Sequence, residues 1–343
     1  MALWLVRSGR YGEHTQRFLD EKRIYLTWDG LKSDLSKLAS RDALLEILAG
    51  VYPQQSPNQR TNHAAQIWAF VKTMKLGDWI VMPNKGKATV NIGEITGDYV
   101  FHADGEDPYF HSRAVKWVAL ELPRSNFDQD LLYSFGAIQT ICRIERNDAE
   151  KRVHAMQEKG WKGGALPAVA VATDAGGTEI DIDLQEIARD QIGRLVIQKF
   201  KGHGMAMLVE AVLKAQGYTT YRSPEGADKG IDILAAPGPL GFGRPRLCVQ
   251  VKSGDSPADL PTLNQLIGAM QNVQADQGLL VSWGGFKSSV YKELPAQFFR
   301  VRLWDQNEFL DELLTHYEKL NDELRAELPL KRVWTEAAQE EGD

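Results

Sequence analysis

Cysteine is scarce in this sequence, which has 343 residues and only two cysteines, Cys142 and Cys248. Two thiols so far apart in the chain form neither a metal-binding motif nor a disulfide framework. Such sparse cysteine is typical of a reducing compartment, so we expect a cytoplasmic protein.

Long apolar runs are also missing. No run approaches the roughly 18 residues that a membrane-spanning helix needs, which predicts no membrane partner. The first residues, MALWLVRSGRYGEH, lack a basic region followed by a long apolar stretch. We therefore expect no secretory signal peptide.

The sequence also lacks an excess of basic residues. It has 40 Lys and Arg against 46 Asp and Glu, which gives a net charge of −6. This balance argues against indiscriminate binding to nucleic acid. It leaves room for a local basic groove and for acidic metal ligands. Hydrophobic residues make up 43% of the chain, which is ordinary for a globular protein.

The length predicts two domains, because a single core rarely grows to this size. A Gly/Ala-rich stretch divides the chain near its middle, and such a composition is typical of a linker. We expect an N-terminal domain over 1–155, a linker over 156–180, a second domain over 181–320 and a polar tail over 321–343.

The N-terminal part is rich in short apolar runs and tryptophan. Strands are predicted over 4–7, 23–28, 78–82, 89–95 and 115–122, and helices over 40–48 and 63–74. The mixture favours a small, strongly bent β-barrel with a few helices. A further short strand, AVAVA, is predicted at 168–172 inside the linker.

The C-terminal part predicts the order helix, helix, strand, strand, strand, helix, strand, strand, helix. The apolar stripe of the helix over 203–216 has the spacing of a core-facing surface. The other predicted elements are strands over 218–223, 230–236, 246–252, 278–283 and 301–304 and helices near 261–275 and 306–320.

Two of these strands carry polar residues that point the same way. Side chains alternate along a strand, so Gln250 and Lys252 share one face of the strand over 246–252. The preceding strand contains Asp232, and the connection APGPLGFGRPR is typical of a hairpin loop. If the strands pair antiparallel, Asp232 lies near Gln250 and Lys252.

Such a cluster suits metal-dependent chemistry. Carboxylate and amide oxygens are hard ligands for Mg²⁺ or Mn²⁺, so Asp232 and Gln250 are the candidate metal ligands. A lysine beside the metal, here Lys252, can orient a water molecule or stabilise the charge that develops on a phosphate. Taken singly, an aspartate near a turn is more often a cap, and a lysine that ends a strand is more often only solvated.

The segments GADKGIDIL and CVQVKSG resemble the catalytic core of the Mrr-like branch of the PD-(D/E)xK nucleases. The resemblance covers roughly 195–315. It implies a restriction-endonuclease-like α/β domain, with Asp232 as metal ligand, Gln250 as second ligand and Lys252 as catalytic lysine.

The sequence departs from this family at one helix position. The family's helix usually carries a glutamate just before a Leu-Val pair, and that register gives Ala206 here. His203 and Glu210 are seven residues apart and share one side of the helix. Either is a candidate for the missing acid, although Glu210 is equally explained as a surface charge and His203 as a cap.

The N-terminal segments TWDGLKSDL, AAQIWAFVKTMKLGDWIVM and IGEITGDYVF resemble EVE domains, which are PUA-like barrels. The resemblance covers roughly 1–125, and the segment 36–62 departs from it. It implies a pocket for a flipped or modified base. The candidate pocket residues are Trp28, Asp29, Asn62, Gln66 and Trp68, although most tryptophans in a protein belong to its core.

Together these patterns predict a modification-dependent DNA endonuclease of bacterial defence, which binds DNA that carries a modified base. One site per chain and cleavage of both strands favour a homodimer. One alternative is a conventional restriction enzyme paired with a methyltransferase. Another is a nucleic-acid-binding module with an inactive nuclease fold, which the missing helix acid favours.

Overall fold

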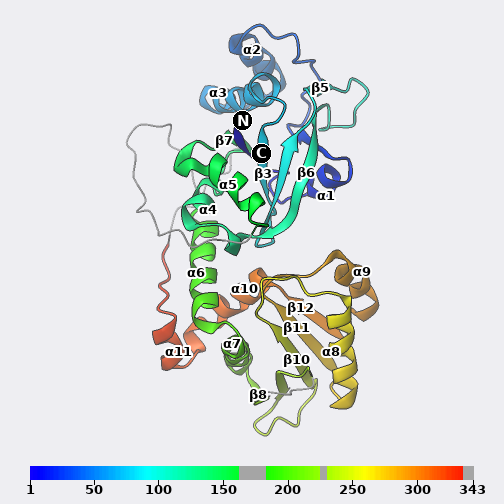
Figure 1. Cartoon of the computed structure of the whole chain (residues 1–343), viewed down its shortest axis with the longest axis vertical. Coiled ribbons are helices and arrows are strands. Elements are labelled where there is room, and N and C mark those ends of the chain that lie inside the picture. The colour runs from blue at the N-terminus through cyan, green and yellow to red at the C-terminus, as the bar shows by residue number, and fades with distance from the viewer. Residues whose placement is uncertain (162–182, 225–229, 335–343) are drawn as a thin grey trace. The chain divides into compact units, whose positions relative to one another are not determined.

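The computed structural model describes residues 1–161, 183–224 and 230–334. These residues form two compact units, which divide between Ala188 and Arg189 inside one helix (Figure 1). Most of the predicted linker, its strand at 168–172 and the last part of the predicted tail lie outside the described residues. Neither unit contains a helix that is both long and apolar enough to cross a membrane, as far as the chain is described.

Unit 1 is a curled, seven-stranded sheet with helices on both faces. Its strands are β1 (Leu3–Val6), β2 (Arg23–Leu26), β3 (Trp79–Pro83), β4 (Thr89–Ile95), β5 (Val100–Phe101), β6 (His111–Pro123) and β7 (Ile141–Arg143). Its helices are α1 (Thr15–Asp20), α2 (Arg41–Val51), α3 (Pro57–Trp68), the π-helix η1 (Ala69–Thr73), the short 3₁₀ turns η2 (Arg124–Asn126) and η3 (Arg146–Asp148), α4 (Gln129–Phe135) and α5 (Ala149–Glu158). All five strands and both helices predicted for this part are confirmed within a few residues, apart from the start of α3.

The strongly bent β-barrel predicted for unit 1 is confirmed only as a curled sheet, and its PUA-like form is not confirmed. The strands follow the open order β2-β6-β4-β3-β1-β7, with β5 beside β6, and within the described residues no pairing joins β2 to β7. Both faces are covered instead, because neighbouring residues of one strand enter two different cores. Leu3 and Leu5 pack into one core, while Trp4 and Val6 pack into the other. Such two-sided burial explains the uninterrupted apolar runs of β1 and β3.

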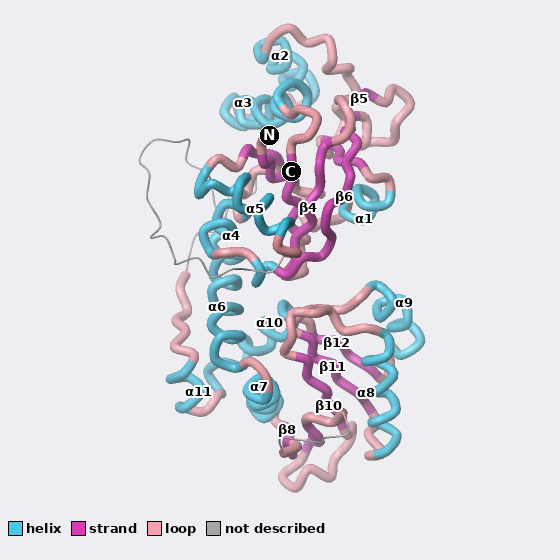
Figure 2. The backbone as a smooth tube through the Cα atoms, viewed as in Figure 1, coloured by secondary structure: helices cyan, strands magenta, loops and turns pink. Residues whose placement is uncertain are grey.

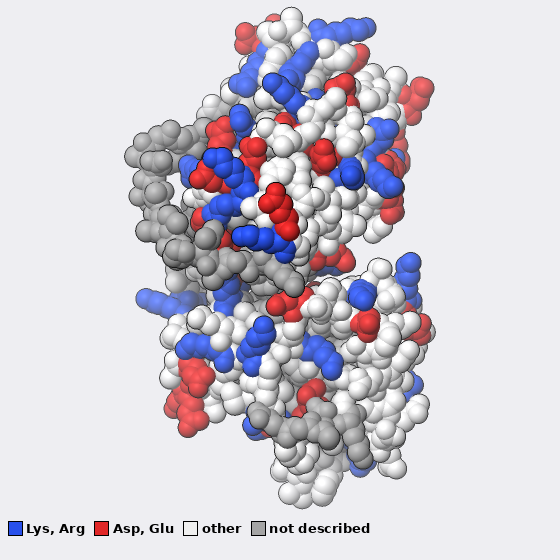
Figure 3. All heavy atoms as spheres, viewed as in Figure 1, with Lys and Arg blue, Asp and Glu red and all other residues white. Residues whose placement is uncertain are grey.

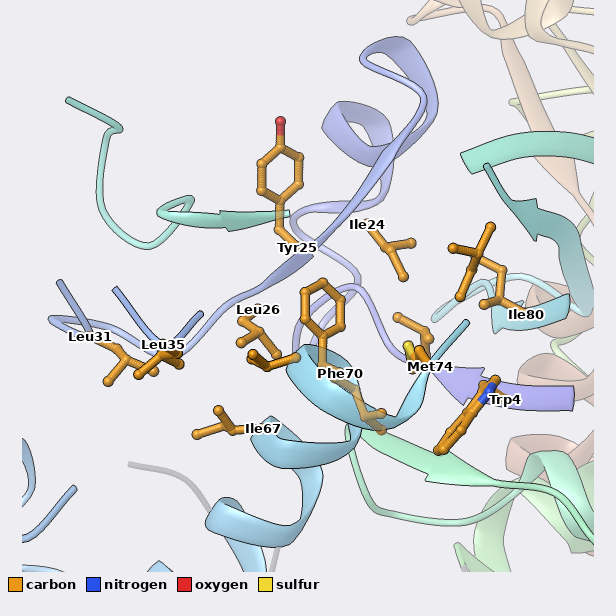
Figure 4. Packing of buried hydrophobic residues seen from close by; sticks show 14 of the residues in the cluster. Trp4, Ile24, Tyr25, Leu26, Leu31, Leu35, Ile67, Phe70, Met74 and Ile80 are labelled. Carbon is orange, nitrogen blue, oxygen red and sulfur yellow. The ribbon is translucent and has the colours of Figure 1, made fainter. Parts of the chain in front are cut away.

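The larger core of unit 1 lies between the sheet and α3 (Figure 4). Trp4 and Ile80 enter it from the sheet, and Ile67 and Phe70 enter it from α3 and η1. Helix α3 begins at a capping box, in which Ser56 and Gln59 bond each other's backbone amides, so the helix start is determined by local sequence. This helix carries three of the candidate pocket residues.

Unit 2 is a five-stranded mixed sheet between two layers of helices (Figure 2). The strand order is β12-β11-β10-β9-β8. Its elements are the main part of α6 (Leu184–Phe200), α7 (His203–Ala215), β8 (Tyr218–Arg222), β9 (Ile233–Pro237), β10 (Leu247–Lys252), α8 (Leu260–Asn272), β11 (Gln277–Ser282), α9 (Ser288–Gln297), β12 (Val301–Trp304), α10 (Gln306–His316), the 3₁₀ turn η4 (Tyr317–Lys319) and α11 (Asp322–Glu327).

The two faces of this sheet follow the predicted alternation. Val249 packs against α6, α7 and α10, whereas Cys248 packs on the other side against α8 and α9. The sequence missed α9 between β11 and β12, because this helix buries one hydrophobic residue, Val290, and contains Pro295. A helix with so short an apolar stripe leaves little periodic signal.

One prediction follows from the turn before β3. The buried Asp78 carboxylate accepts hydrogen bonds from the Ala2 amide (2.8 Å), the Trp4 indole (3.0 Å) and the Lys75 amide (3.0 Å). We expect Asp78→Ala to lower the unfolding free energy of unit 1 by about 3 kcal/mol, because buried donors lose their acceptor. Asp78→Asn, which keeps one oxygen, should lose less. Hydrogen exchange at the β1 and β3 amides measures the effect, and unchanged protection in Asp78→Ala would contradict it.

Candidate functional site

The strands β9 and β10 pair antiparallel, as predicted, and bring Asp232 beside the end of β10. The register pairs Ile233 with Val249, and Asp232 is the residue directly before Ile233. The Asp232 amide donates to the Val249 carbonyl (3.0 Å), and the Val251 amide donates to Asp232 Oδ2 (2.7 Å). On its other side, the Ser223 amide donates to the Asp232 carbonyl (2.9 Å). Both neighbouring strands therefore hold this aspartate.

Asp232 and Lys252 line a pocket of about 590 Å³. It lies where β10 ends, at the start of α7 and beside the loop that leads into α8. Its lining residues are Gly202, His203, Ala206, Ser223, Pro224, Asp232, Val251, Lys252, Ser253, Gly254, Ser256, Pro257, Ala258, Asp259 and Thr262. A carboxylate, an ammonium group and several hydroxyl groups thus face one cavity.

Gln250 belongs to the same strand but is fully buried and is not among the lining residues. Its Nε2 donates to Gln265 Oε1 on α8 (3.1 Å). Its Oε1 has no hydrogen-bond partner in the described part of the chain. A buried carbonyl oxygen without a partner calls for an explanation, and a role as a cation ligand is one.

Helix α7 begins at the pocket. His203 is its first residue and lines the cavity, and the Gly202 amide donates to Ser253 Oγ (2.9 Å), which ties the helix start to the loop after β10. Ala206, which stands where the resembled family has its glutamate, also lines the pocket. This wall of the pocket carries His203 and no carboxylate from α7.

Glu210 does not share the pocket with His203. Seven residues of helix rise about 10 Å, so a shared helix face does not bring the two side chains to one place. The Glu210 carboxylate accepts from Thr220 (2.8 Å) and forms ion pairs with Lys214 (2.9 Å) and Arg222 (3.3 Å). Lys214 lies on α7 itself, whereas Thr220 and Arg222 attach α7 to β8.

The donor set fits a magnesium-type ion better than zinc. In the described residues, no group of three or more His, Cys, Asp or Glu side chains could hold a metal. Asp232 nevertheless presents a carboxylate to the pocket, and Gln250 on the adjoining strand has an amide oxygen without a partner among the described residues. Mg²⁺ commonly binds through one or two protein oxygens plus water and substrate phosphate, so these residues fit it.

Cys248 is a buried free cysteine on β10, two residues before Gln250. Burial, and then the negative charge of Asp232, raises the pKa of its thiol to about 11. At neutral pH the thiol is therefore protonated and buried, so it is a structural residue of the α8 side.

Sequence reasoning did not identify the hydroxyl-bearing residues of the pocket, Ser223, Ser253, Ser256 and Thr262. A signal existed, because KSGDSPAD follows Lys252 directly and is a run of small and polar residues. Asp259 caps α8, and its hydrogen bonds with Thr262 hold the pKa of the Asp259 carboxyl below its usual range.

In unit 1, the candidate pocket residues are partly brought together. The half-buried Trp28 ring packs edge-on against His63 of α3 at 5.7 Å between centroids, and the Asp29 carbonyl accepts from the Tyr52 hydroxyl (2.7 Å). Asn62 accepts from Gln66 (3.2 Å) one turn further along α3.

The other two candidates have structural contacts. Gln66 is buried, and its Oε1 accepts from the Ile141 amide (3.0 Å), which joins α3 to β7. Trp68 lies at the end of α3 with the Lys72 ammonium 5.9 Å from its ring centroid. Within the predicted set Gln66 is buried, Asp29 is exposed, and Trp28, Asn62 and Trp68 are half-buried.

Residues 197–313 match the model of a protein family described as restriction endonuclease. This span includes every lining residue of the pocket, so unit 2 carries a restriction endonuclease domain. Residues 4–143 match a family described only as a domain of unknown function, DUF8426. The likeness of this part to EVE domains therefore stays a prediction.

Two solved structures match this chain at low sequence identity and low TM-score. The DNA modification-dependent restriction endonuclease AspBHI is 14% identical, with 80% of this chain and 74% of that chain covered and a TM-score of 0.34. The MspJI restriction endonuclease in complex with a 27-mer oligonucleotide is 15% identical, with 95% and 79% covered and a TM-score of 0.33. No curated protein matches this sequence. Because both TM-scores are low, the domain assignment depends on the match over 197–313.

A prediction follows from the partners of Glu210. Burial raises the pKa of this carboxyl, but the Lys214 and Thr220 hydrogen bonds outweigh that effect and lower the pKa below its ordinary value of 4.5. The folded state therefore gains stability that is complete above the unfolded pKa and is lost as the pH falls through the folded one. We expect Glu210→Gln to unfold more easily than the unchanged protein at pH 7 and the difference to be smaller at pH 3. Urea unfolding at both pH values measures this, with the exposed Glu323→Gln as control, and an equal difference at both values would contradict it.

Proposed function

We propose that this protein, whose unit 2 carries a restriction endonuclease domain, is a modification-dependent DNA endonuclease. The observation that carries the proposal is the restriction endonuclease match around a pocket lined by Asp232 and Lys252. In this proposal residues 181–320 cut the DNA backbone and residues 1–155 read a modified base. The host setting is bacterial defence in the cytoplasm, and the acting form is a homodimer, since cleavage of two strands needs two sites.

The chain's own residues have distinct roles in this proposal. Asp232 and Gln250 hold Mg²⁺ or Mn²⁺, and the Val251 amide keeps the Asp232 carboxylate in place. Lys252 orients the attacking water and stabilises the charge on the phosphate. The bound ion supplies Lewis-acid polarisation and a template for the phosphate.

The start of α7 and the loop after Lys252 bind the phosphate backbone in this proposal. His203, Ser253 and Thr262 line the pocket and offer donors to phosphate oxygens. His203 is also the remaining candidate for the acid position that Ala206 leaves empty. Glu210 has a structural role, because its carboxylate is engaged by Thr220, Lys214 and Arg222.

We expect Asp232→Asn and Lys252→Ala each to reduce DNA cleavage at least about a thousandfold while DNA affinity changes little. Removal of a metal ligand or of the lysine charge weakens transition-state stabilisation more than ground-state binding. Single-turnover cleavage with Mg²⁺ measures the first effect, and gel shift in Ca²⁺ measures the second. Glu210→Gln is the matched control, since it changes an acid of the same domain outside the pocket and should keep its cleavage rate.

Near-normal cleavage by either folded variant would contradict the assignment of that residue to the catalytic site.

Activity should also require Mg²⁺ or Mn²⁺ and fail with Ca²⁺ alone, because Ca²⁺ tolerates looser geometry and positions water less well. Full cleavage in excess EDTA would contradict the metal mechanism. A protein that binds DNA but never cuts it would instead favour the nucleic-acid-binding module with an inactive nuclease fold. The alanine at position 206 of the pocket wall, where the resembled family has a glutamate, supports that alternative.

The proposed division of labour assigns base recognition to unit 1. Trp28 is half-buried beside His63 and offers a ring for stacking, and a flipped base regains its unpairing cost only in a matching pocket. On the drawn face of unit 1, side chains of both signs are interspersed (Figure 3). This pattern favours recognition of a particular base over adhesion to any phosphate backbone.

We expect the cleavage-deficient Asp232→Asn protein to bind DNA with 5-methylcytosine, 5-hydroxymethylcytosine or glucosylated cytosine more tightly than plain DNA. Trp28→Leu should erase this preference, and Trp28→Phe should keep most of it, since base stacking is worth roughly 1–3 kcal/mol. Fluorescence anisotropy on matched duplexes measures the preference. Equal affinity for every duplex would contradict the assignment of unit 1 as a domain that recognises a modified base. It would favour a conventional restriction enzyme, whose partner would be a methyltransferase.

A further inference from the structure

The two polar atoms of the Gln250 side-chain amide differ in their hydrogen bonding. Its nitrogen is paired with Gln265 Oε1 at 3.1 Å, whereas its oxygen is buried without a hydrogen-bond partner among the described residues. Such a carbonyl group costs about 1–3 kcal/mol when it is left unpaired. A folded protein tolerates this cost where the oxygen serves a ligand.

The unpaired oxygen belongs to a residue that sits beside Asp232. The peptide group that follows Gln250 donates its Val251 amide proton to Asp232 Oδ2 at 2.7 Å. The Asp232 amide also donates to the Val249 carbonyl at 3.0 Å, so Asp232 is bonded to the β10 backbone on both sides of Gln250. Gln250 therefore lies on β10 between the two residues that bond Asp232, whose carboxylate the proposed metal site needs.

An amide side chain can present either its oxygen or its nitrogen, since half a turn about the last bond exchanges them. Only the oxygen can bind a cation. Gln265 lies on α8, and the backbone at Gly230 packs on the pair so closely that a Cβ there would meet Gln265 Nε2 at 2.7 Å and Gln250 Nε2 at 3.3 Å. The two glutamines are thus confined beneath the Gly-x-Asp segment.

We propose that Gln265 is a positioning residue that sets the orientation of the Gln250 amide. By accepting a hydrogen bond from Gln250 Nε2, Gln265 keeps the Gln250 oxygen available to the metal ion beside Asp232. This inference depends on the proposed metal site. It assigns a role to a residue on α8, a helix that provides no ligand in that proposal.

The test compares the unchanged protein with the Gln250→Glu variant, in which the orientation of the side chain at position 250 no longer affects which atom can bind the metal. In Gln250→Glu both terminal atoms are oxygens, so no neighbour is needed to choose between them. The effect of Gln265→Leu on metal binding should then depend on the residue at position 250. Titration calorimetry of the full-length protein with Mn²⁺, in the absence of DNA, measures the dissociation constant in each background.

We expect Gln265→Leu to weaken Mn²⁺ binding about tenfold in the unchanged background, the scale at which partners of metal ligands act. In the Gln250→Glu background the same substitution should change the Mn²⁺ dissociation constant less than about twofold. Gln265→Met serves as a second variant of similar length, should Gln265→Leu fold poorly. Gln271→Leu is the matched control, since Gln271 is exposed on the same helix, and it should have no effect in either background.

Equal losses in both backgrounds, or no loss in the unchanged one, would overturn the proposal. A variant that binds Mn²⁺ normally but binds DNA more weakly in EDTA would also overturn it, because Gln265 would then contact DNA directly. Asp232→Ala separates this failure from failure of the proposed function. If Asp232→Ala binds Mn²⁺ as tightly as the unchanged protein, the metal site itself is absent. If it does not, only the role of Gln265 has failed.

Discussion

The candidate site of unit 2 depends on how the chain around Asp232 is held between two strands. Its carbonyl accepts from Ser223, its amide donates to Val249, and its carboxylate accepts from the Val251 amide. These bonds join β8, β9 and β10 just where the pocket begins. Without them, the carboxylate would sit on an irregular segment, since β9 itself begins only at Ile233. The geometry of the pocket is therefore a property of the sheet rather than of a loop.

Both units obtain a stable scaffold in the same way, by covering a sheet on two faces. In unit 1 successive residues of β1 enter different cores, and in unit 2 Cys248 and Val249 do the same on β10. A strand buried on both faces has little freedom to shift, because a slip of one residue would exchange its two sets of side chains. The packing on both faces of the sheet therefore fixes the positions of Asp232, Gln250 and Lys252.

Strand periodicity predicted a cluster of which Asp232 and Lys252 line the pocket, whereas Gln250 is buried outside its lining. Two-residue alternation placed Gln250 and Lys252 on one face, and the Gly/Pro-rich connection indicated the antiparallel hairpin that sets Asp232 beside them. Helix periodicity was less informative. It put His203 and Glu210 on one face, yet only His203 lines the pocket, because position along the helix axis matters as much as direction around it. The helix α9 and the open form of the unit 1 sheet were missed for similar reasons, since neither is encoded by a local pattern.

The sequence by itself determined the local elements, the β9–β10 hairpin and the chemistry available at its end. Backbone preference, side-chain alternation and turn composition act over a few residues, so they can be read directly. Only the tertiary structure decided that Ala206 lines the pocket, that Glu210 attaches α7 to β8 and that Gln265 bonds Gln250. These contacts join residues on different elements, and their geometry depends on how helices pack across a sheet. No local pattern in the chain specifies that packing.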